Sequence, residues 1–281
     1  MMASSNLYVS RYIKLNGVDL RYLDWGSEGK PHLICLHGNS GQAHIWDEFA
    51  ERMSEDYHVY ALDQRGHGES SWATDGYHRN NYVSDLTAFI NTMAIEKVVL
   101  VGLSMGGWNS LLYAESNPKK VNRFVMVDIA PEGSPELSEQ RKNWRPAPLE
   151  FYTLVDALNW AKENDPWATE KRRQKDVANR IRQHPDGMWR WKCDPAITTY
   201  HLPDNIEPEY IQRYWTAVEN VSCPFLEVRG RESITVGDET IRKMEESNKL
   251  FSSVDVHDAG HVVTVDKPAE FIESTKEFLA I

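Results

Sequence analysis

The chain has 281 residues, of which 41% are hydrophobic and 26% are charged, and its formal net charge is −11. This composition is ordinary for a globular protein, and the length is sufficient for one α/β domain that carries an insertion. The negative charge argues against nucleic acid as the main partner, because binding phosphates requires clustered lysines and arginines.

The cysteines and the N-terminus favour a cytoplasmic protein. Cys35, Cys193 and Cys223 are far apart in the sequence and odd in number, so we expect no structural disulfide. Residues 1–8 lack the basic start and the apolar stretch of a signal peptide. No segment approaches 18 consecutive apolar residues, so the sequence predicts no membrane span.

The first 130 residues alternate between strand-like and helix-like patterns. Residues 8–15 and 18–25 alternate apolar and polar side chains around Asn16-Gly17, which predicts a β-hairpin. Short apolar runs then alternate with helical patterns, which predicts a mostly parallel sheet with helices on both faces. The predicted strands are 32–36, 58–62, 97–101 and 121–127, and the predicted helices are 43–53, 82–93 and 108–117.

This alternation stops between residues 131 and 222, where the chain becomes helical, charged and rich in tryptophan and loses its short apolar strands. We predict a helical cap at 131–222, inserted into an α/β core formed by 1–130 and 223–281. Predicted strands at 224–230 and 250–256 and helices at 238–247 and 268–281 complete the core. Most of the tryptophans in the insertion are interpreted as packing residues; the six are Trp144, Trp160, Trp167, Trp189, Trp191 and Trp215.

A candidate nucleophile lies between a predicted strand and a predicted helix. Residues 102–106 have the sequence GLSMG, and a tight strand-to-helix turn requires small residues on both sides of its serine. The Gly-x-Ser-x-Gly pattern alone occurs by chance, but here the strand and the helix that should flank it are both predicted. We therefore predict that Ser104 is a nucleophile.

A serine hydroxyl needs a base, and the base needs an orienting acid. The candidate base is His261, which follows the last predicted strand, because loops after parallel strands meet at one edge of the sheet. Asp128, at the end of the strand 121–127, is the favoured acid, although it could instead cap a turn. Glu232, in the loop after the next strand, is the alternative acid, although it could be a solvated loop residue.

Two backbone amides are predicted to form an oxyanion hole. The N–H of Met105 comes immediately after Ser104 at the start of a helix, where the helix dipole favours negative charge. The N–H of Asn39 lies in the glycine-rich segment 37–41, which follows the first parallel strand. Gly38 would allow close approach of this backbone. The alternative for this segment is a plain glycine-rich turn.

No motif for a metal ion, a nucleotide or a dinucleotide is present in the sequence, so we expect no metal and no cofactor. Residues 63–70, DQRGHGES, contain aspartate and histidine, but their spacing fits no standard metal pattern. This segment is interpreted as a structural turn.

Taken together, these landmarks resemble the α/β-hydrolase fold family over essentially the whole chain. The resemblance implies an eight-stranded sheet and a Ser-acid-His hydrolase that needs no cofactor. In many members the acid is an aspartate three residues beyond a glycine, after the strand that follows the lid; here that position is Ser233. The matching motifs are His37-Gly38, Asp63-x-Arg65-Gly66-x-Gly68-x-Ser70, Gly102-x-Ser104-x-Gly106 and Gly260-His261.

A narrower resemblance favours Asp128 as the acid. The segment 127–131, VDIAP, combined with Gly230-x-x-Ser233, is similar to a branch of small acyl-ester and thioester hydrolases. In that branch the acid precedes the lid, which implies that Asp128 orients His261 and that Ser233 is an auxiliary hydrogen-bond partner.

The expected activity is hydrolysis by water of a carboxylic ester with a small to medium acyl or alcohol group, through an acyl-enzyme on a Ser-His-Asp triad. Hydrolysis of a carbon–carbon bond, a lactone or a thioester by the same residues is an alternative. A non-catalytic or slow-turnover ligand receptor is the alternative from another class. The sequence predicts neither the individual substrate nor the oligomeric state.

Overall fold

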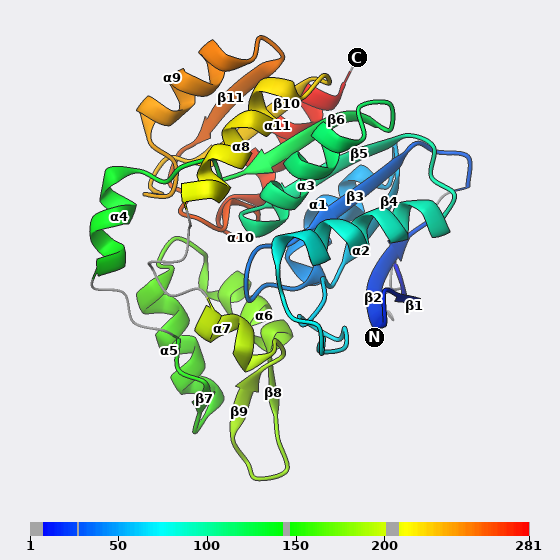
Figure 1. Ribbon diagram of the computed structural model, residues 1–281. Helices are drawn as coiled ribbons and strands as arrows, with labels where there is room; N and C mark the ends of the chain where they lie inside the picture. Colours follow the sequence, from blue (N-terminus) through cyan, green and yellow to red (C-terminus); the bar gives the residue numbers. More distant parts are fainter. Residues whose placement is uncertain (1–7, 27, 143–146, 201–207, 281) are drawn as a thin grey trace.

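A computed structural model describes residues 8–26, 28–142, 147–200 and 208–280. Residues 1–7, most of the segment used to argue against a signal peptide, lie outside this range, as does Trp144. An eight-stranded sheet forms the centre of the molecule in the order β1-β2-β4-β3-β5-β6-β10-β11 (Figure 1). The strands are β1 (Val9–Leu15), β2 (Val18–Trp25), β3 (His32–Leu36), β4 (His58–Leu62), β5 (Val98–Leu103), β6 (Val121–Val127), β10 (Phe225–Gly230) and β11 (Phe251–Val256).

The predicted hairpin and the mostly parallel sheet are confirmed. β1 and β2 pair antiparallel, and Asn16 and Gly17 between them have φ angles of 49° and 82°, as a tight two-residue hairpin turn requires. β2 also pairs antiparallel with β4, whereas the remaining neighbours pair in parallel. The carboxyl ends of the parallel strands therefore share one edge.

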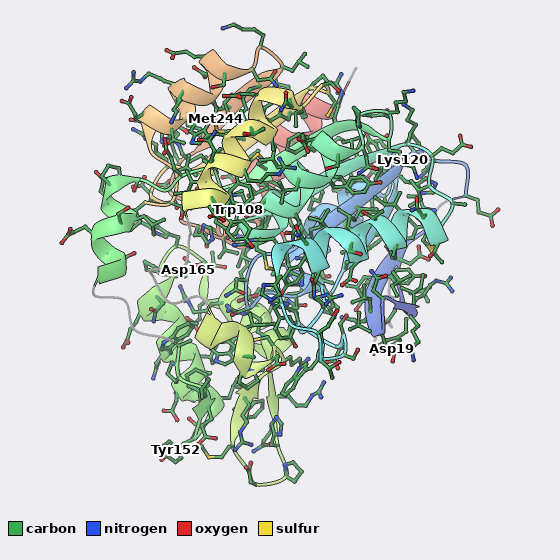
Figure 2. All side chains as sticks on the ribbon, viewed as in Figure 1. Asp19, Trp108, Lys120, Tyr152, Asp165 and Met244 are labelled. Atoms are coloured by element: carbon green, nitrogen blue, oxygen red, sulfur yellow. The ribbon has the colours of Figure 1, made fainter. Side chains whose placement is uncertain are left out.

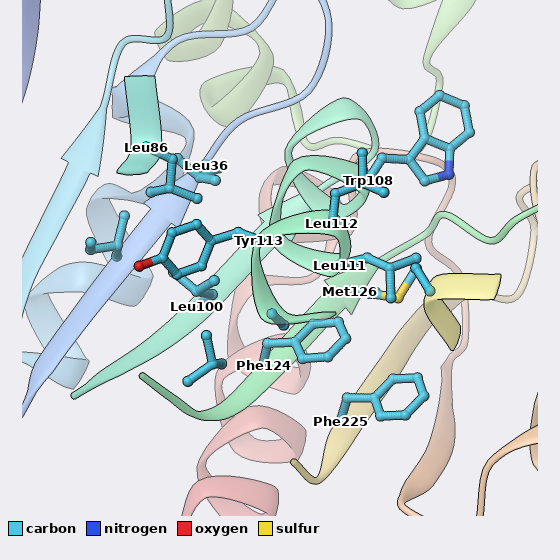
Figure 3. Packing of buried hydrophobic residues seen from close by; sticks show 14 of the residues in the cluster. Leu36, Leu86, Leu100, Trp108, Leu111, Leu112, Tyr113, Phe124, Met126 and Phe225 are labelled. Atoms are coloured by element: carbon cyan, nitrogen blue, oxygen red, sulfur yellow. The ribbon is translucent and has the colours of Figure 1, made fainter. Parts of the chain in front are cut away.

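Helices cover both faces of the sheet, because side chains from successive strand residues enter opposite cores. Leu100, Phe124 and Met126 contribute to the core beneath α3, as Figure 3 shows, whereas Val101 and Val125 contribute to the other core. One face carries α2 (Arg79–Thr92), α3 (Met105–Ser116), α8 (Pro208–Asn220) and α9 (Asp238–Ser247). The other carries η1 (Ala43–Trp46), α1 (Asp47–Met53), α10 (Val263–Asp266) and α11 (Pro268–Leu279).

The predicted helix over 43–53 is in fact a 3₁₀ turn, η1, followed by α1. The predicted helix over 82–93 begins three residues earlier, at Arg79. The last helix ends at Leu279, and residue 281 lies outside the described residues. Helix ends are set by local capping and fraying, which apolar spacing alone locates poorly.

The inserted segment contains both helices and strands, so the prediction that it lacks short strands is wrong. A three-stranded antiparallel sheet in the order β7-β9-β8 packs with the helices around Phe151, Val177 and Trp191. These strands are only two or three residues long, too short for an apolar run to reveal. The elements are α4 (Pro135–Lys142), β7 (Glu150–Phe151), α5 (Leu154–Asn164), α6 (Glu170–Arg180), β8 (Ile181–Gln183), β9 (Trp189–Trp191) and α7 (Pro195–Tyr200).

Helix α8 packs as part of the core, although the predicted cap included it. Tyr214 of α8 stacks on Trp108 of α3, with ring centroids 4.8 Å apart and an interplanar angle of 7°. Trp215 of the same helix is also buried in the core beneath α3. The division into core and cap stays a proposal, and this packing favours ending the cap before Pro208 instead of at residue 222.

The cap contacts loops that follow the carboxyl ends of the parallel strands (Figure 1). Asp194 N–H donates to Gly66 O at 2.8 Å, and the Tyr77 hydroxyl donates to the Asp194 carboxylate. Lys192 also pairs with Glu69 at 3.0 Å. Gly66, Glu69 and Tyr77 follow β4, so the inserted segment contacts the edge of the sheet at which the candidate site was predicted.

Among the described helices, none has both the length and the apolar character needed to cross a bilayer.

Candidate active site

Ser104 is the single residue between β5 and α3, and its φ of 51° and ψ of −119° are strained for a residue with a side chain. Its N–H donates to Val127 O at 3.0 Å, which ties the turn to the end of β6. A Cβ on Gly102 would lie 2.3 Å from Gly106 O, and one on Gly106 would lie 2.2 Å from Leu36 O. Both glycines are therefore required for the close approach of strand, turn and helix.

We expect Gly106→Ala to destabilise the protein by about 1–3 kcal/mol, because the added methyl forces α3 away from the backbone of β3. Urea unfolding of both proteins measures this change in free energy. Gly237→Ala is a useful comparison, since its methyl would come no closer than 3.4 Å to another atom. Equal destabilisation by the two substitutions would contradict the proposed role of the close contact.

The predicted oxyanion loop lies directly beside Ser104. A Cβ added to Gly38 would lie 3.1 Å from Ser104 Cβ, so the loop backbone and the serine are in contact. Met105 N–H is in the first turn of α3 and has no intrahelical acceptor. Within the described residues, neither this N–H nor that of Asn39 donates to a protein acceptor. No described acceptor therefore occupies either of these N–H groups.

His37 anchors this loop through a network of hydrogen bonds that the sequence analysis did not identify. Its buried ring donates from Nδ1 to Gly38 O at 2.7 Å and accepts at Nε2 from Gln64 N–H at 2.9 Å. Burial lowers the pKa of His37 to about 4, so the ring is neutral near pH 7. Gln64 Nε2 in turn donates to His37 O, and Asn109 Nδ2 of α3 donates to Gln64 Oε1.

His261 and Asp128, although 133 residues apart in the sequence, form a direct hydrogen bond. His261 Nδ1 donates to Asp128 Oδ2 at 2.7 Å. A carboxylate can only accept, so Nδ1 carries the proton and Nε2 of the neutral ring is left with the free lone pair. Thr235 Oγ1 lies 3.2 Å from the same nitrogen, a contact that the sequence analysis missed.

Asp128 is fully buried, and its carboxylate accepts hydrogen bonds from three donors. Besides His261, Gly230 N–H donates to Oδ1 at 3.1 Å, and the Ser233 hydroxyl donates to Oδ2 at 2.5 Å. Ser233 thus contacts Asp128 directly, and the auxiliary role that the resemblance implied for it stays a proposal. Glu232, the alternative acid, is exposed. The geometry therefore favours Asp128.

The pKa of His261 is raised above its ordinary value. Burial by itself lowers this pKa, but the hydrogen bond to Asp128 and the charge of that carboxylate outweigh the effect. The imidazolium form is consequently stabilised while the ring remains able to accept a proton. Within the described part of the chain, no hydrogen bond joins the Ser104 hydroxyl to His261, and such contacts are often long in the absence of substrate.

Cap residues approach both loops of the site. A Cβ on Gly260, next to His261, would lie 2.5 Å from Trp167 Cδ1. Arg180 Nε donates to Ser40 O in the oxyanion loop at 3.1 Å, and its guanidinium lies over the Trp191 ring. The sequence analysis named Trp167 only among the tryptophans interpreted mostly as packing residues, and it did not identify Arg180, because only the folded insertion brings these residues to the core.

Asp266 is a buried carboxyl group at the end of α10, the short helix that begins two residues after His261. It is only 2% exposed, and its Oδ2 accepts Gly260 N–H at 2.9 Å. Burial, and then the charge of Asp165 from the cap, raise the pKa of Asp266 to about 8; Gly260 N–H, His261 and Arg173 oppose this shift. Figure 2 shows Asp165 where the cap meets the core. The structure thus places an acid pair beside the histidine.

We expect Asp266→Asn to stabilise the protein increasingly as the pH rises from about 4 to 8. In this window the folded protein holds a proton that the unfolded chain has released, so wild-type stability falls with rising pH. The amide avoids this penalty and retains an acceptor for Gly260 N–H. Thermal unfolding at pH 4, 6, 8 and 9 measures the difference in Tm between the two proteins.

The matched control for this prediction is Glu273→Gln, which removes an exposed carboxylate from α11. It should show no comparable growth of stability with pH. A constant difference in Tm between Asp266→Asn and the wild type at all four pH values would contradict the assignment of a raised pKa to Asp266.

The segment 63–70 has the structural role that was predicted for it. Asp63 is buried and accepts hydrogen bonds from the N–H groups of Ala43 and Glu69. Arg65 forms a bidentate ion pair with Asp85. Among the residues that the structure describes, no three histidine, cysteine, aspartate or glutamate side chains are grouped so that they could hold a metal ion. The described cysteines are free and buried.

The mostly parallel sheet and the serine between β5 and α3 define the class of protein. The family model described as alpha/beta hydrolase fold matches residues 31–268. The chain belongs to the α/β-hydrolase family and is a hydrolase.

Relatives with assigned activities match nearly the whole chain. A 3-hydroxybutyrate-oligomer hydrolase from Cupriavidus necator is 30% identical and covers 96% of this chain and 96% of its own. An esterase from Mycobacterium tuberculosis is 28% identical over 92% of this chain and 85% of its own. The crystal structure of an α/β hydrolase from Novosphingobium aromaticivorans matches with a TM-score of 0.83 and 25% identity, covering 97% of this chain and 98% of that one.

Proposed function

We propose that the protein hydrolyses carboxylic esters through an acyl-enzyme, with Ser104 as nucleophile, His261 as base and Asp128 as orienting acid. The observation that carries this proposal is the hydrogen bond from His261 Nδ1 to the buried carboxylate of Asp128, at the edge of the sheet that also presents Ser104. This bond fixes the tautomer in which Nε2 can accept a proton.

In the proposed reaction, Ser104 Oγ forms a bond to the carbonyl carbon as its proton moves to His261 Nε2. The carbonyl oxygen becomes an oxyanion, which accepts hydrogen bonds from the N–H groups of Asn39 and Met105. Collapse of this intermediate breaks the ester bond, and His261 returns the proton to the departing alcohol. Water then attacks the acyl-enzyme by the same path and releases the acid.

The ester as substrate class is supported by the relatives, which include an esterase and a hydrolase of 3-hydroxybutyrate oligomers. Such oligomers are chains of short hydroxy acids joined by ester bonds. They match the small to medium acyl group expected from the sequence. We therefore propose short esters, including oligomers of this kind, as the substrates to test first.

Labelling with a fluorophosphonate, followed by mass spectrometry of the modified peptide, tests the nucleophile. We expect one adduct, on Ser104, that forms together with loss of activity. Hydrolysis of p-nitrophenyl esters of increasing chain length, of a 3-hydroxybutyrate trimer and of a vinylogous diketone then tests the reaction class.

Faster turnover of the diketone than of every ester would replace ester hydrolysis by carbon–carbon bond hydrolysis. Release of one equivalent of alcohol per protein, followed by no further turnover, would favour a ligand receptor instead of an enzyme acting on esters. Labelling at another residue, with Ser104 unmodified, would contradict the proposed mechanism itself.

A further inference from the structure

Glu227 is a buried carboxyl group for which the proposed reaction has no role. It lies in the middle of β10 and is 0% exposed. Strand alternation places it on the same face as Phe225, and its direct neighbour on β6 is Met126. Figure 3 shows Met126 and Phe225 in the apolar core beneath α3. An apolar residue would be expected here, because burying an unpaired carboxyl group is costly.

The carboxyl group of Glu227 supplies a hydrogen-bond acceptor where the pairing of β6 with β10 ends, at the backbone turn that contains Asp128. Strand pairing between β6 and β10 ends at Val127 and Val228, and Asp128 N–H still donates to Val228 O. The chain then turns toward the cap, with Asp128 at a φ of 48°. The next N–H, that of Ile129, donates at 3.0 Å to Glu227 Oε1. Without this acceptor a buried N–H would be left unpaired.

The surroundings of Glu227 favour its neutral form. Burial, and then the negative charge of Asp128, raise the pKa of Glu227 well above its ordinary value. Arg229, the nearby cation, is already paired with Asp255 and Asp238. Within the described residues Oε2 has no hydrogen-bond partner, whereas the carboxylate of Asp128 has three donors. Burial and the unpartnered Oε2 therefore both favour a protonated Glu227.

We propose that Glu227, held as a neutral carboxylic acid, is a positioning residue that fixes the backbone turn of Asp128 and so directs its carboxylate toward His261. This inference rests on the proposed function, because it assigns to Glu227 an effect on the triad. The neutral form matters as much as the contact. A second buried charge would stabilise the imidazolium form of His261 further and make the ring a poorer proton donor to the leaving group.

Two substitutions separate the charge of Glu227 from its hydrogen bond. Glu227→Gln retains an acceptor for Ile129 N–H and carries no charge. We expect its kcat, its KM and the acid limb of its kcat/KM profile to equal those of the wild type. Glu227→Leu removes the acceptor, and a displacement of a catalytic group by about 1 Å costs on the order of 10²-fold in rate. We therefore expect kcat to fall by about that factor, with KM unchanged.

The acid limb of the kcat/KM profile provides a readout that would not change if Glu227 had only a structural role. Because Asp128 raises the pKa of His261, a misdirected Asp128 should move the acid limb of Glu227→Leu to lower pH. If Glu227→Leu does not fold, Glu227→Asp is used in its place. The aspartate side chain is one methylene shorter, which moves the acceptor away from Ile129 N–H and should also lower kcat. Phe225→Leu is the matched control on the same face of β10, and it should lower Tm but not kcat.

All values of kcat are normalised to the fraction of protein that fluorophosphonate labels at Ser104, so that unfolded protein does not lower the measured kcat. A downward shift of the acid limb in Glu227→Gln would show that Glu227 is charged and overturn the neutral assignment. Wild-type kcat per labelled site in Glu227→Leu or Glu227→Asp would overturn the positioning role. Absence of labelling at Ser104 in the wild type would instead contradict the proposed function, which keeps the two failures distinct.

Discussion

Ser104→Ala is expected to lower kcat on a p-nitrophenyl ester by on the order of 10⁶-fold, because removing the nucleophilic hydroxyl prevents formation of the acyl-enzyme. The fold should remain, since the hydrogen bond that anchors the turn comes from the backbone N–H of Ser104 to Val127 O. The measurement is kcat together with Tm for the variant and the wild type.

Ser116→Ala, at the exposed end of the same helix, is the matched control and should retain wild-type activity. Binding and the oxyanion hole alone should leave a residual rate roughly 10³–10⁴-fold above the uncatalysed reaction. Faster turnover than this by Ser104→Ala would refute the nucleophile assignment.

Asp128→Asn is expected to lower kcat by about 10⁴-fold, because an amide in this position can donate to Nδ1 and so favours the wrong tautomer of His261. The acid limb of the residual activity should also move to lower pH. The hydrogen bond and the charge of Asp128 raise the pKa of His261, and the amide removes the charge. A pH profile of kcat/KM for the variant and the wild type measures both effects.

Glu232→Gln tests the alternative acid and should leave the profile unchanged, because Glu232 is exposed. If Glu232→Gln abolished activity while Asp128→Asn retained it, the assignment of the acid would be wrong.

The order and type of the core elements could be predicted because most parallel strands are short, largely apolar runs bounded by a helix or a turn, and because β1 and β2 alternate apolar and polar residues around Asn16-Gly17. The nucleophile turn could be predicted because Gly102 and Gly106 are required by backbone contacts that only glycine permits. The proximity of His261 and Asp128 followed from one topological rule, that loops after parallel strands meet at one edge. Local pattern and topology together therefore predicted the turn at Ser104 and the proximity of His261 and Asp128, whereas their action as a triad stays a proposal.

Other features depend on tertiary contacts that leave no local pattern. The cap strands are too short to show alternation, and α8 shows an amphipathic pattern without revealing which surface it covers. Asp266 acquires its raised pKa from burial and then from the charge of Asp165, about 100 positions away. Glu227 did interrupt an apolar strand, which was a visible signal, but the acceptor role of its side chain became evident only from the turn at Asp128.

The position of Asp128, directly after β6 and just before the insertion, has a consequence for how this enzyme can be altered. Under the proposed mechanism, the acid and the entrance of the cap share one backbone turn, and Trp108 Nε1 also holds Ala130 O there at 3.0 Å. A foreign cap grafted directly after Asp128 would disturb the triad along with specificity. Grafts that begin beyond Pro131 should change substrate preference and spare the chemistry.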